Sequence, residues 1–352
     1  MRNISLPTRR APLILKVCGF SLIEIMVAMA LSLLLLGGVI AIFASSRASY
    51  ETTDKLSRIQ ENGRFALDQL IRDIRSAGYV GCARAPTYLS TSLNDADVLQ
   101  WNFLDGPVAG FEAIDEDSWS PTLDDSVTDA ASGSDVLVIR VPRRDAEPLR
   151  LTADMTAGTD VLTVPAVTTG VRAGDIALAY SCEAQAYFQV TSFAAGEIQH
   201  DDSGDEPGNG SDDISYAFRE NAEVIPVQTV IYYIRPSTAD AATPSLWRRV
   251  ALNAAEELVE GVEQMELEFG LDTTGDSVVD EYVTADEVGS NWADVLSVSV
   301  ALLVRSLQEY GADTDQRQYR LLNDVVVDAP GDRRLREVFT ATASIRNRVP
   351  VN

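Results

Sequence analysis

The sequence predicts an α+β protein, in which one long N-terminal helix is followed by a mainly antiparallel β head. Residues 20–44 form an apolar run, and residues 45–77 continue it with the three- and four-residue spacing of a helix. Residues 78–352 contain short strand-like runs separated by clusters of Gly, Pro, Asp and Ser. With a basic leader over residues 1–19, we expect a leader, a membrane helix, an amphipathic continuation of that helix and a β-rich head.

The leader and the apolar run predict how the chain meets a membrane. The leader has no acidic residue, and its basic residues are Arg2, Arg9, Arg10 and Lys16. The 25 residues of the run, at about 1.5 Å each, make a helix somewhat longer than the hydrocarbon core of about 30 Å. Because basic flanks stay on the cytoplasmic side, the remaining chain is expected to cross the membrane. The only charge in the run is Glu24, and an acid inside a spanning segment costs roughly 2.5 to 3.5 kcal/mol and usually marks a function.

The junction between leader and run carries a specific motif. Residues 19–24 read Gly-Phe-Ser-Leu-Ile-Glu, which resembles the class III signal of type IV prepilins and type II secretion pseudopilins. This resemblance implies that a prepilin peptidase cuts between Gly19 and Phe20 and that the new amino group of Phe20 is N-methylated. It also implies that Glu24 pairs with the N-terminal amine of a neighbouring subunit in the fibre, where an unpaired charge is costly. The alternative is an uncleaved membrane anchor.

Composition and cysteine usage point to a compartment outside the cytoplasm. The net charge is −25, and it becomes −29 once the four basic leader residues are removed. Nucleic acid is therefore not an expected partner, and the acidity favours solubility or divalent cation binding. Cys18 lies in the leader, so Cys82 and Cys182 remain as a pair, and in an oxidising space we predict a disulfide between them. The alternative is two unrelated buried thiols.

The continuation of the helix has one apolar face. Its apolar and small residues recur at helical spacing: Leu56, Ile59, Gly63, Ala66, Leu67, Leu70 and Ile74. Charged residues, Asp68 and Asp73 among them, are assigned to the opposite, polar face, and Gly78 supplies a C-terminal stop. The segment is thus expected to pack on the head.

The head reads as mostly β. The predicted strands are residues 136–141, 161–167, 175–181, 187–193, 224–234, 246–251, 265–271, 295–305 and 321–327. Long polar connections are expected at residues 115–134 and 196–213. The size of the head allows either one enlarged domain or two lobes.

Three motifs of the head suggest a family. They are Gly-Tyr-Val-Gly-Cys at residues 78–82, Phe-Gly-Leu-Asp at residues 269–272, and Trp-Ala-Asp-Val at residues 292–295, which runs into Val-Ala-Leu-Leu-Val-Arg at residues 300–305. Their sequences and order resemble the PilW family of type IV pilus minor pilins. The resemblance implies a pilin-like fold and a low-abundance subunit that helps to prime pilus assembly, at or near the tip. Implied partners are other minor pilins, the major pilin, a PilY-type tip protein, the prepilin peptidase and the inner-membrane assembly machinery.

One loop has the spacing of a calcium site. Oxygen donors stand at relative positions 1, 3, 5, 7 and 9 of the loop, namely Asp272, Thr274, Asp276, Val278 (through its carbonyl) and Asp280. Ser277 replaces the usual glycine, and Val283 stands where a bidentate glutamate is expected. Ca²⁺ is therefore a possible cofactor, and a solvated acidic hairpin turn is the alternative.

No pattern of catalytic residues accompanies these motifs. His200 is the only histidine, and neither a Ser-His-Asp arrangement nor a zinc site has supporting context around it. No glycine-rich phosphate loop follows a predicted strand. We therefore expect a protein that is not an enzyme.

Three hypotheses of function follow. The first is a minor pilin, anchored in the inner membrane by one helix with a periplasmic head and later assembled into the surface pilus, whose use in adhesion, twitching motility or DNA uptake stays open. The second is a type II secretion pseudopilin of the J type, and the third is a Ca²⁺-dependent surface adhesin on a pilin-like anchor.

Overall fold

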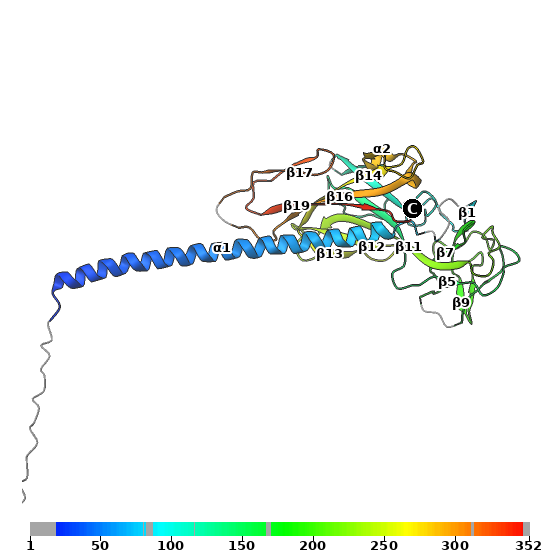
Figure 1. Cartoon of the computed structure of the whole chain (residues 1–352), viewed down its shortest axis with the longest axis horizontal. Helices are drawn as coiled ribbons and strands as arrows, with labels where there is room; N and C mark the ends of the chain where they lie inside the picture. Colours follow the sequence, from blue (N-terminus) through cyan, green and yellow to red (C-terminus); the bar gives the residue numbers. More distant parts are fainter. Residues whose placement is uncertain are drawn as a thin grey trace, which may run out of the picture. The chain divides into compact units, whose positions relative to one another are not determined.

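A single helix, α1 (Leu22–Ser76), precedes all the β-structure of the chain (Figure 1). The protein is seen here as a computed structural model, which describes residues 19–79, 81, 87–115, 117–166, 170–310 and 313–347. The chain divides into two compact units within the helix, Met1–Asp54 and Lys55–Asn352. The helix ends close to the predicted stop, because Gly78 adopts φ of +59° and its N–H donates to the carbonyl of Arg140 at 3.0 Å.

A large mixed sheet forms one part of the head. Its central path runs β1-β8-β7-β11-β4-β2-β3, with β12 and β13 added beside β11, which also pairs with the short β5. All its pairs are antiparallel except β1 with β8. The strands are β1 (Tyr88–Thr91), β2 (Val108–Asp115), β3 (Ser118–Ser120), β4 (Val136–Pro142), β5 (Leu149–Arg150), β7 (Ile176–Tyr180), β8 (Ala184–Gln189), β11 (Glu223–Pro236), β12 (Pro244–Val250) and β13 (Glu256–Glu260).

A second, four-stranded antiparallel sheet has the order β15-β14-β16-β19 (Figure 1). Its strands are β14 (Val262–Leu271), β15 (Glu281–Val283), β16 (Val295–Arg305) and β19 (Arg336–Ser344). The short helix α2 (Ala285–Val288) and the 3-10 turn η1 (Trp292–Asp294) connect β15 to β16. Two smaller sheets complete the head: β6 (Leu162–Thr163) with β9 (Ser192–Ala194) and β10 (Glu197–Gln199), and β17 (Gln318–Arg320) with β18 (Val326–Asp328).

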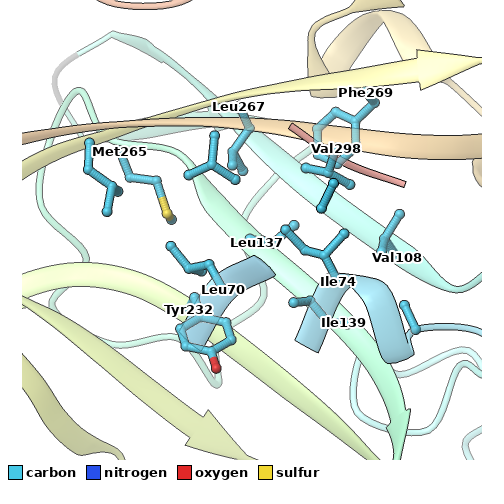
Figure 2. Packing of buried hydrophobic residues seen from close by; sticks show 14 of the residues in the cluster. Leu70, Ile74, Val108, Leu137, Ile139, Tyr232, Met265, Leu267, Phe269 and Val298 are labelled. Atoms are coloured by element: carbon cyan, nitrogen blue, oxygen red, sulfur yellow. The ribbon is translucent and has the colours of Figure 1, made fainter. Parts of the chain in front are cut away.

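The main core lies between the two larger sheets and the C-terminal part of α1. Ile59, Ala66, Leu70 and Ile74 are at most 1 % exposed and share one hydrophobic cluster with residues of both sheets. Figure 2 shows Leu70 and Ile74 within this cluster, together with Leu137, Ile139 and Tyr232 of the large sheet and Met265, Leu267 and Val298 of the second sheet. Each large apolar side chain buried in this way contributes roughly 1.5 to 3 kcal/mol.

Two positions of α1 differ from the predicted pattern. Leu56, which we assigned to the apolar face, is 38 % exposed. Asp73, which we assigned to the polar face, is 1 % exposed. The remaining positions follow the predicted helical spacing. At Gly63 the helix lies close to β19, because a Cβ on this residue would be only 2.4 Å from the ring of Phe339.

A second hydrophobic cluster lies among residues 151–224. Phe188, Ile198, Phe218 and Val224 are fully buried in it, and none of its members belongs to the main cluster. The 14-residue strand β11 links the two regions, since its first residues pair with β7 and its later residues pair with β12 and with most of β4. The two largest hydrophobic cores of the described head therefore share one strand.

Most of the predicted strands are present, but three were wrong in detail. The described part of the run 161–167 contains only the two-residue strand β6. The run 187–193 is two strands, because after β8 the chain changes partner and the N–H of Thr191 bonds to Gln199 in the three-stranded sheet. The run 321–327 is mostly a turn between β17 and β18, in which Asn323 and Asp324 both have positive φ. The prediction also missed several strands, among them β2, β13 and the edge strand β19, most of whose side chains are only partly buried. The predicted connections 115–134 and 196–213 contain the short strands β3 and β10.

Candidate functional site

The N-terminal motif forms the start of α1. The N–H of Ser21 donates to Oε2 of Glu24 at 2.9 Å, and the N–H of Glu24 donates to Oγ of Ser21 at 3.2 Å. This reciprocal pair is a capping box, which satisfies two of the free N–H groups at the helix start. The Ser-x-x-Glu spacing is visible in the sequence, but our prediction assigned a role to Glu24 alone and none to Ser21. In the single chain the Glu24 carboxylate holds its own helix end.

The bond between Gly19 and Phe20 lies just outside that helix. Neither residue belongs to a helix or strand, both are exposed, and no other group lies within 4 Å of a Cβ built on Gly19. A protease needs an accessible, non-helical segment, and these two residues provide one. Cleavage and N-methylation at this bond stay predictions.

The apolar run after the motif is covered by nothing within its unit. Phe20 is 83 % exposed and Leu34 is 74 % exposed, and the other large apolar side chains of the run are likewise exposed. Among the described residues, this is the one helix long and apolar enough to cross a membrane, and the most apolar window has a mean hydropathy of 2.7. Such a surface requires lipid or other apolar helices around it.

The second part of the helix is held by a buried carboxylate. Asp73 accepts a hydrogen bond from the hydroxyl of Tyr232 at 2.6 Å, and its other oxygen pairs with Arg144. The Nε of Arg248 lies 3.8 Å from Oδ2 of Asp73, the oxygen that accepts from Tyr232. Burial, reinforced by this carboxylate, holds the pKa of Tyr232 far above its usual range. Asp73 therefore ties α1 to β11, to β12 and to the loop after β4.

Of the two cysteines in the predicted disulfide, only Cys182 lies within the described residues. Cys182 follows β7 and is disulfide-bonded. Cys82 and Cys18 lie outside the described residues. The pairing of Cys82 with Cys182 stays a prediction.

The acidic loop after β14 uses its carboxylates for its own backbone. Asp272 accepts hydrogen bonds from the N–H groups of Gly275, Asp276 and Ser277 at 2.6 to 3.2 Å. Asp280 accepts from Thr273, through both N–H and hydroxyl, and from the N–H of Thr274.

These hydrogen bonds lower the pKa of Asp280. The loop is thus held as a hairpin turn by its own hydrogen bonds. No three of its carboxylates bring their oxygen atoms within 4.8 Å of one another. Ca²⁺ binding by Asp272, Thr274, Asp276, Val278 and Asp280 stays a hypothesis.

Three other carboxylates do meet in the head. Ligand atoms of Glu112 on β2, Asp135 before β4 and Glu266 on β14 all lie within 4.8 Å of one another, the closest acidic group among the described residues. Asp135 accepts the N–H groups of Ala113 and Leu267 at 2.9 and 2.8 Å, and Glu266 accepts from Gln264 at 2.6 Å.

Burial raises the pKa of Glu112 to about 7 and that of Glu266 to about 7. Burial also raises the pKa of Asp135, which the two neighbouring acids raise further. Such a group shares protons near neutral pH. Its members are far apart in the sequence, and no local pattern could have revealed it.

Comparison with known families gives two matches, in different parts of the chain. Residues 231–347 match the model of PilW, Type IV Pilus-assembly protein W. Residues 14–40 match the model of the prokaryotic N-terminal methylation motif. Comparison with curated proteins and with solved structures finds no match. The first range covers β16, β19 and most of the main core, and the second covers the capping box and most of the exposed apolar run. The chain therefore carries a region similar to the prokaryotic N-terminal methylation motif at its N-terminus and a region similar to PilW in its C-terminal part.

Proposed function

We propose that this protein is a minor pilin that takes part in priming and assembling type IV pili, at or near the pilus tip and together with other minor pilins. The observation that carries the proposal is the change of surroundings along one helix. α1 leaves an apolar surface exposed after a prepilin-type motif and then packs into the core of a head that contains a PilW region.

The architecture of the head supports a place at the end of a fibre. A subunit repeated along a fibre must pack its head against copies of itself on several sides. This head has a ten-stranded sheet and two large cores, and the second of these cores, within residues 151–224, lies outside the PilW region. A bulky, irregular head is accommodated most easily where few neighbours surround it, which is the tip.

The proposed life of the protein has two stages. It is first an inner-membrane protein with one spanning helix, a periplasmic head and a leader that the prepilin peptidase removes. It then joins other minor pilins, the major pilin and a PilY-type tip protein through the inner-membrane assembly machinery. Its contribution is to assembly and not to catalysis.

Mass spectrometry of the N-terminal peptide tests this proposal. We expect a chain that begins at N-methylated Phe20, both in sheared surface fibres and in the inner membrane. A processed chain confined to the envelope would instead favour a pseudopilin of the J type. An intact Met1 terminus would mean that the N-terminal segment is an uncleaved membrane anchor.

Two matched variants separate processing from assembly. Gly19→Val is expected to block leader removal, because it changes the residue on the leader side of the cleaved bond. Glu24→Ala is expected to leave cleavage intact and to lower fibre number, because it removes the proposed partner of a neighbour's amine. Ser21→Ala is the control for the capping box, since it weakens the helix start by about 1 kcal/mol without removing that charge. Normal fibre number in Glu24→Ala would contradict the assigned role.

A further inference from the structure

A cavity of about 160 Å³ lies in the head where the chain leaves α1. Its wall includes Tyr79 after the helix, Phe103, Arg140 on β4, Tyr187 on β8 and Ala293 in η1. None of these residues has a role in the proposed function. We propose that this cavity is a binding site for a carboxylate with a small apolar body, presented by a free organic acid or by the C-terminus of a partner chain.

Arg140 is the reason for a carboxylate. Its side chain is buried, with the residue 5 % exposed, and Nη1 donates to the carbonyl of Gly106 at 3.0 Å. Among the described residues, its Nε has no hydrogen-bond partner and its guanidinium forms no ion pair within 4.0 Å. Burial lowers its pKa to about 10, although Asp105 and Tyr187 act in the opposite direction. A buried guanidinium without an anion is costly, and a carboxylate matches its planar donors.

A second buried arginine shows what a satisfied site looks like in this head. Arg336 on β19 is 4 % exposed and pairs with Glu263, Asp332 and Asp315 at 2.6 to 3.4 Å. Its charge is therefore compensated within the chain. Arg140 is buried to a similar extent and adjoins a cavity, but among the described residues it has only the longer-range attraction of Asp105 in place of an ion pair. We therefore expect a closer compensating anion to come from outside the chain.

The walls of the cavity define the body of the ligand. The rings of Phe103 and Tyr187 are stacked, with centroids 5.1 Å apart and planes 13° from parallel. The hydroxyl of Tyr79 is bonded to that of Tyr180 at 3.1 Å, which fixes the ring of Tyr79. A cavity of about 150 Å³ holds a benzene-sized molecule. Benzoate, or the last residue of a chain that ends in an apolar side chain, is therefore of suitable size and charge.

Thermal unfolding of the full-length protein in detergent tests the site. Sodium benzoate is titrated, with benzamide as the uncharged analogue and sodium chloride as the control for ionic strength. We expect benzoate to raise the unfolding midpoint in a saturable way and benzamide and chloride to leave it unchanged. Equal shifts with benzoate and benzamide, or no shift with benzoate, would overturn the proposal.

Variants assign the effect to Arg140. Arg140→Met is expected to weaken benzoate binding by about tenfold or more, the loss of a charge-assisted hydrogen bond. Arg219→Met is the matched control, because the Arg219 side chain is 84 % exposed and lies outside this cavity, and it should keep the benzoate shift. Retained benzoate affinity in Arg140→Met would overturn the proposal.

A second variant and a peptide pair complete the test. Ala293→Phe places a large ring at an exposed position of the wall, so it should abolish the benzoate shift even where Arg140→Met does not fold, and an unchanged shift would overturn the proposal. A short peptide ending in Phe is compared with its C-terminal amide. If benzoate and the free-acid peptide both bind and the amide does not, the site accepts a partner's C-terminus. If benzoate binds and neither peptide does, the site takes a small free acid.

Discussion

The two parts of α1 have the same backbone conformation and opposite surroundings. In the N-terminal part, large apolar side chains such as Leu34 are exposed, whereas in the C-terminal part Ile59, Leu70 and Ile74 are at most 1 % exposed. The N-terminal part therefore needs a partner from outside the chain, lipid or neighbouring helices, and the C-terminal part finds its partners within the head. One helix can thus serve both a membrane or fibre and a folded domain.

The largest effect on the stability of the head is expected from Asp73. Asp73→Ala leaves the Tyr232 hydroxyl without its acceptor and removes the carboxylate that Arg144 and Arg248 face. The free energy of unfolding should therefore fall by about 3 to 5 kcal/mol. Asp68→Ala, on the exposed side of the same helix, should change it by less than about 0.5 kcal/mol. Trp fluorescence in a denaturant titration of the full chain measures both, because all four tryptophans lie in the head. Equal midpoints would show that Asp73 does not hold the helix.

A matched leucine pair tests the comparison directly. Leu70→Ala removes a fully buried side chain from the main core and should destabilise the head by about 2 to 5 kcal/mol. Leu34→Ala makes the same chemical change in the exposed part of the helix and should leave the denaturant midpoint of the head unchanged. A similar loss in both variants would mean that the exposed part also supports the head.

A smaller effect is expected from the acidic group of Glu112, Asp135 and Glu266. The folded pKa of Glu266, about 7, lies above its usual value of 4.5, so the folded state holds extra protons between these values. The corresponding stability is fully present below about pH 4.5 and is lost as the pH rises through about 7. The three carboxylates share their protons, and Asp286 and Glu287 of α2 add repulsion at Glu112.

Glu266→Gln is therefore expected to reduce the loss of stability between pH 5 and pH 8 by about 1 to 3 kcal/mol. Glu268→Gln, two residues along β14, is the control and should keep the wild-type slope. Unfolding titrations at each pH give the comparison. Identical slopes in wild type and Glu266→Gln would show that the group does not bind extra protons in the folded state.

The smallest effect concerns loop 272–280. On the calcium hypothesis, millimolar Ca²⁺ added to chelator-treated protein stabilises it by about 1 kcal/mol. Asp276→Asn should abolish this gain, because the Asp276 carboxylate is engaged only by the N–H of Val278 among the described contacts. Calorimetry and melting midpoints provide the measurement. No heat and no shift in the wild type would leave the loop as a hydrogen-bonded turn.

Local patterns predicted the elements better than the site. The strand β16 coincides with a predicted run, because most of its residues are apolar and nearly all are buried. The strand β19 was missed because an edge strand with partly exposed side chains has no such pattern. Asp73 was wrongly assigned to the polar face. Helical spacing predicts the direction of its side chain, but it does not reveal that Tyr232, Arg144 and Arg248 lie on that side.

The sequence by itself determined the N-terminal motif, the long helix with its apolar run, the mainly antiparallel head and the resemblance to PilW. These features depend on composition and on the spacing of residues within short segments, so they can be recognised before the chain is folded. Only the tertiary structure decided that β11 joins the two largest cores of the head, that Asp73 is a buried anchor, and that Arg140 lines a cavity and forms no ion pair with a described residue. These features depend on contacts between residues far apart in the chain, where burial and pairing set the energy of each charge.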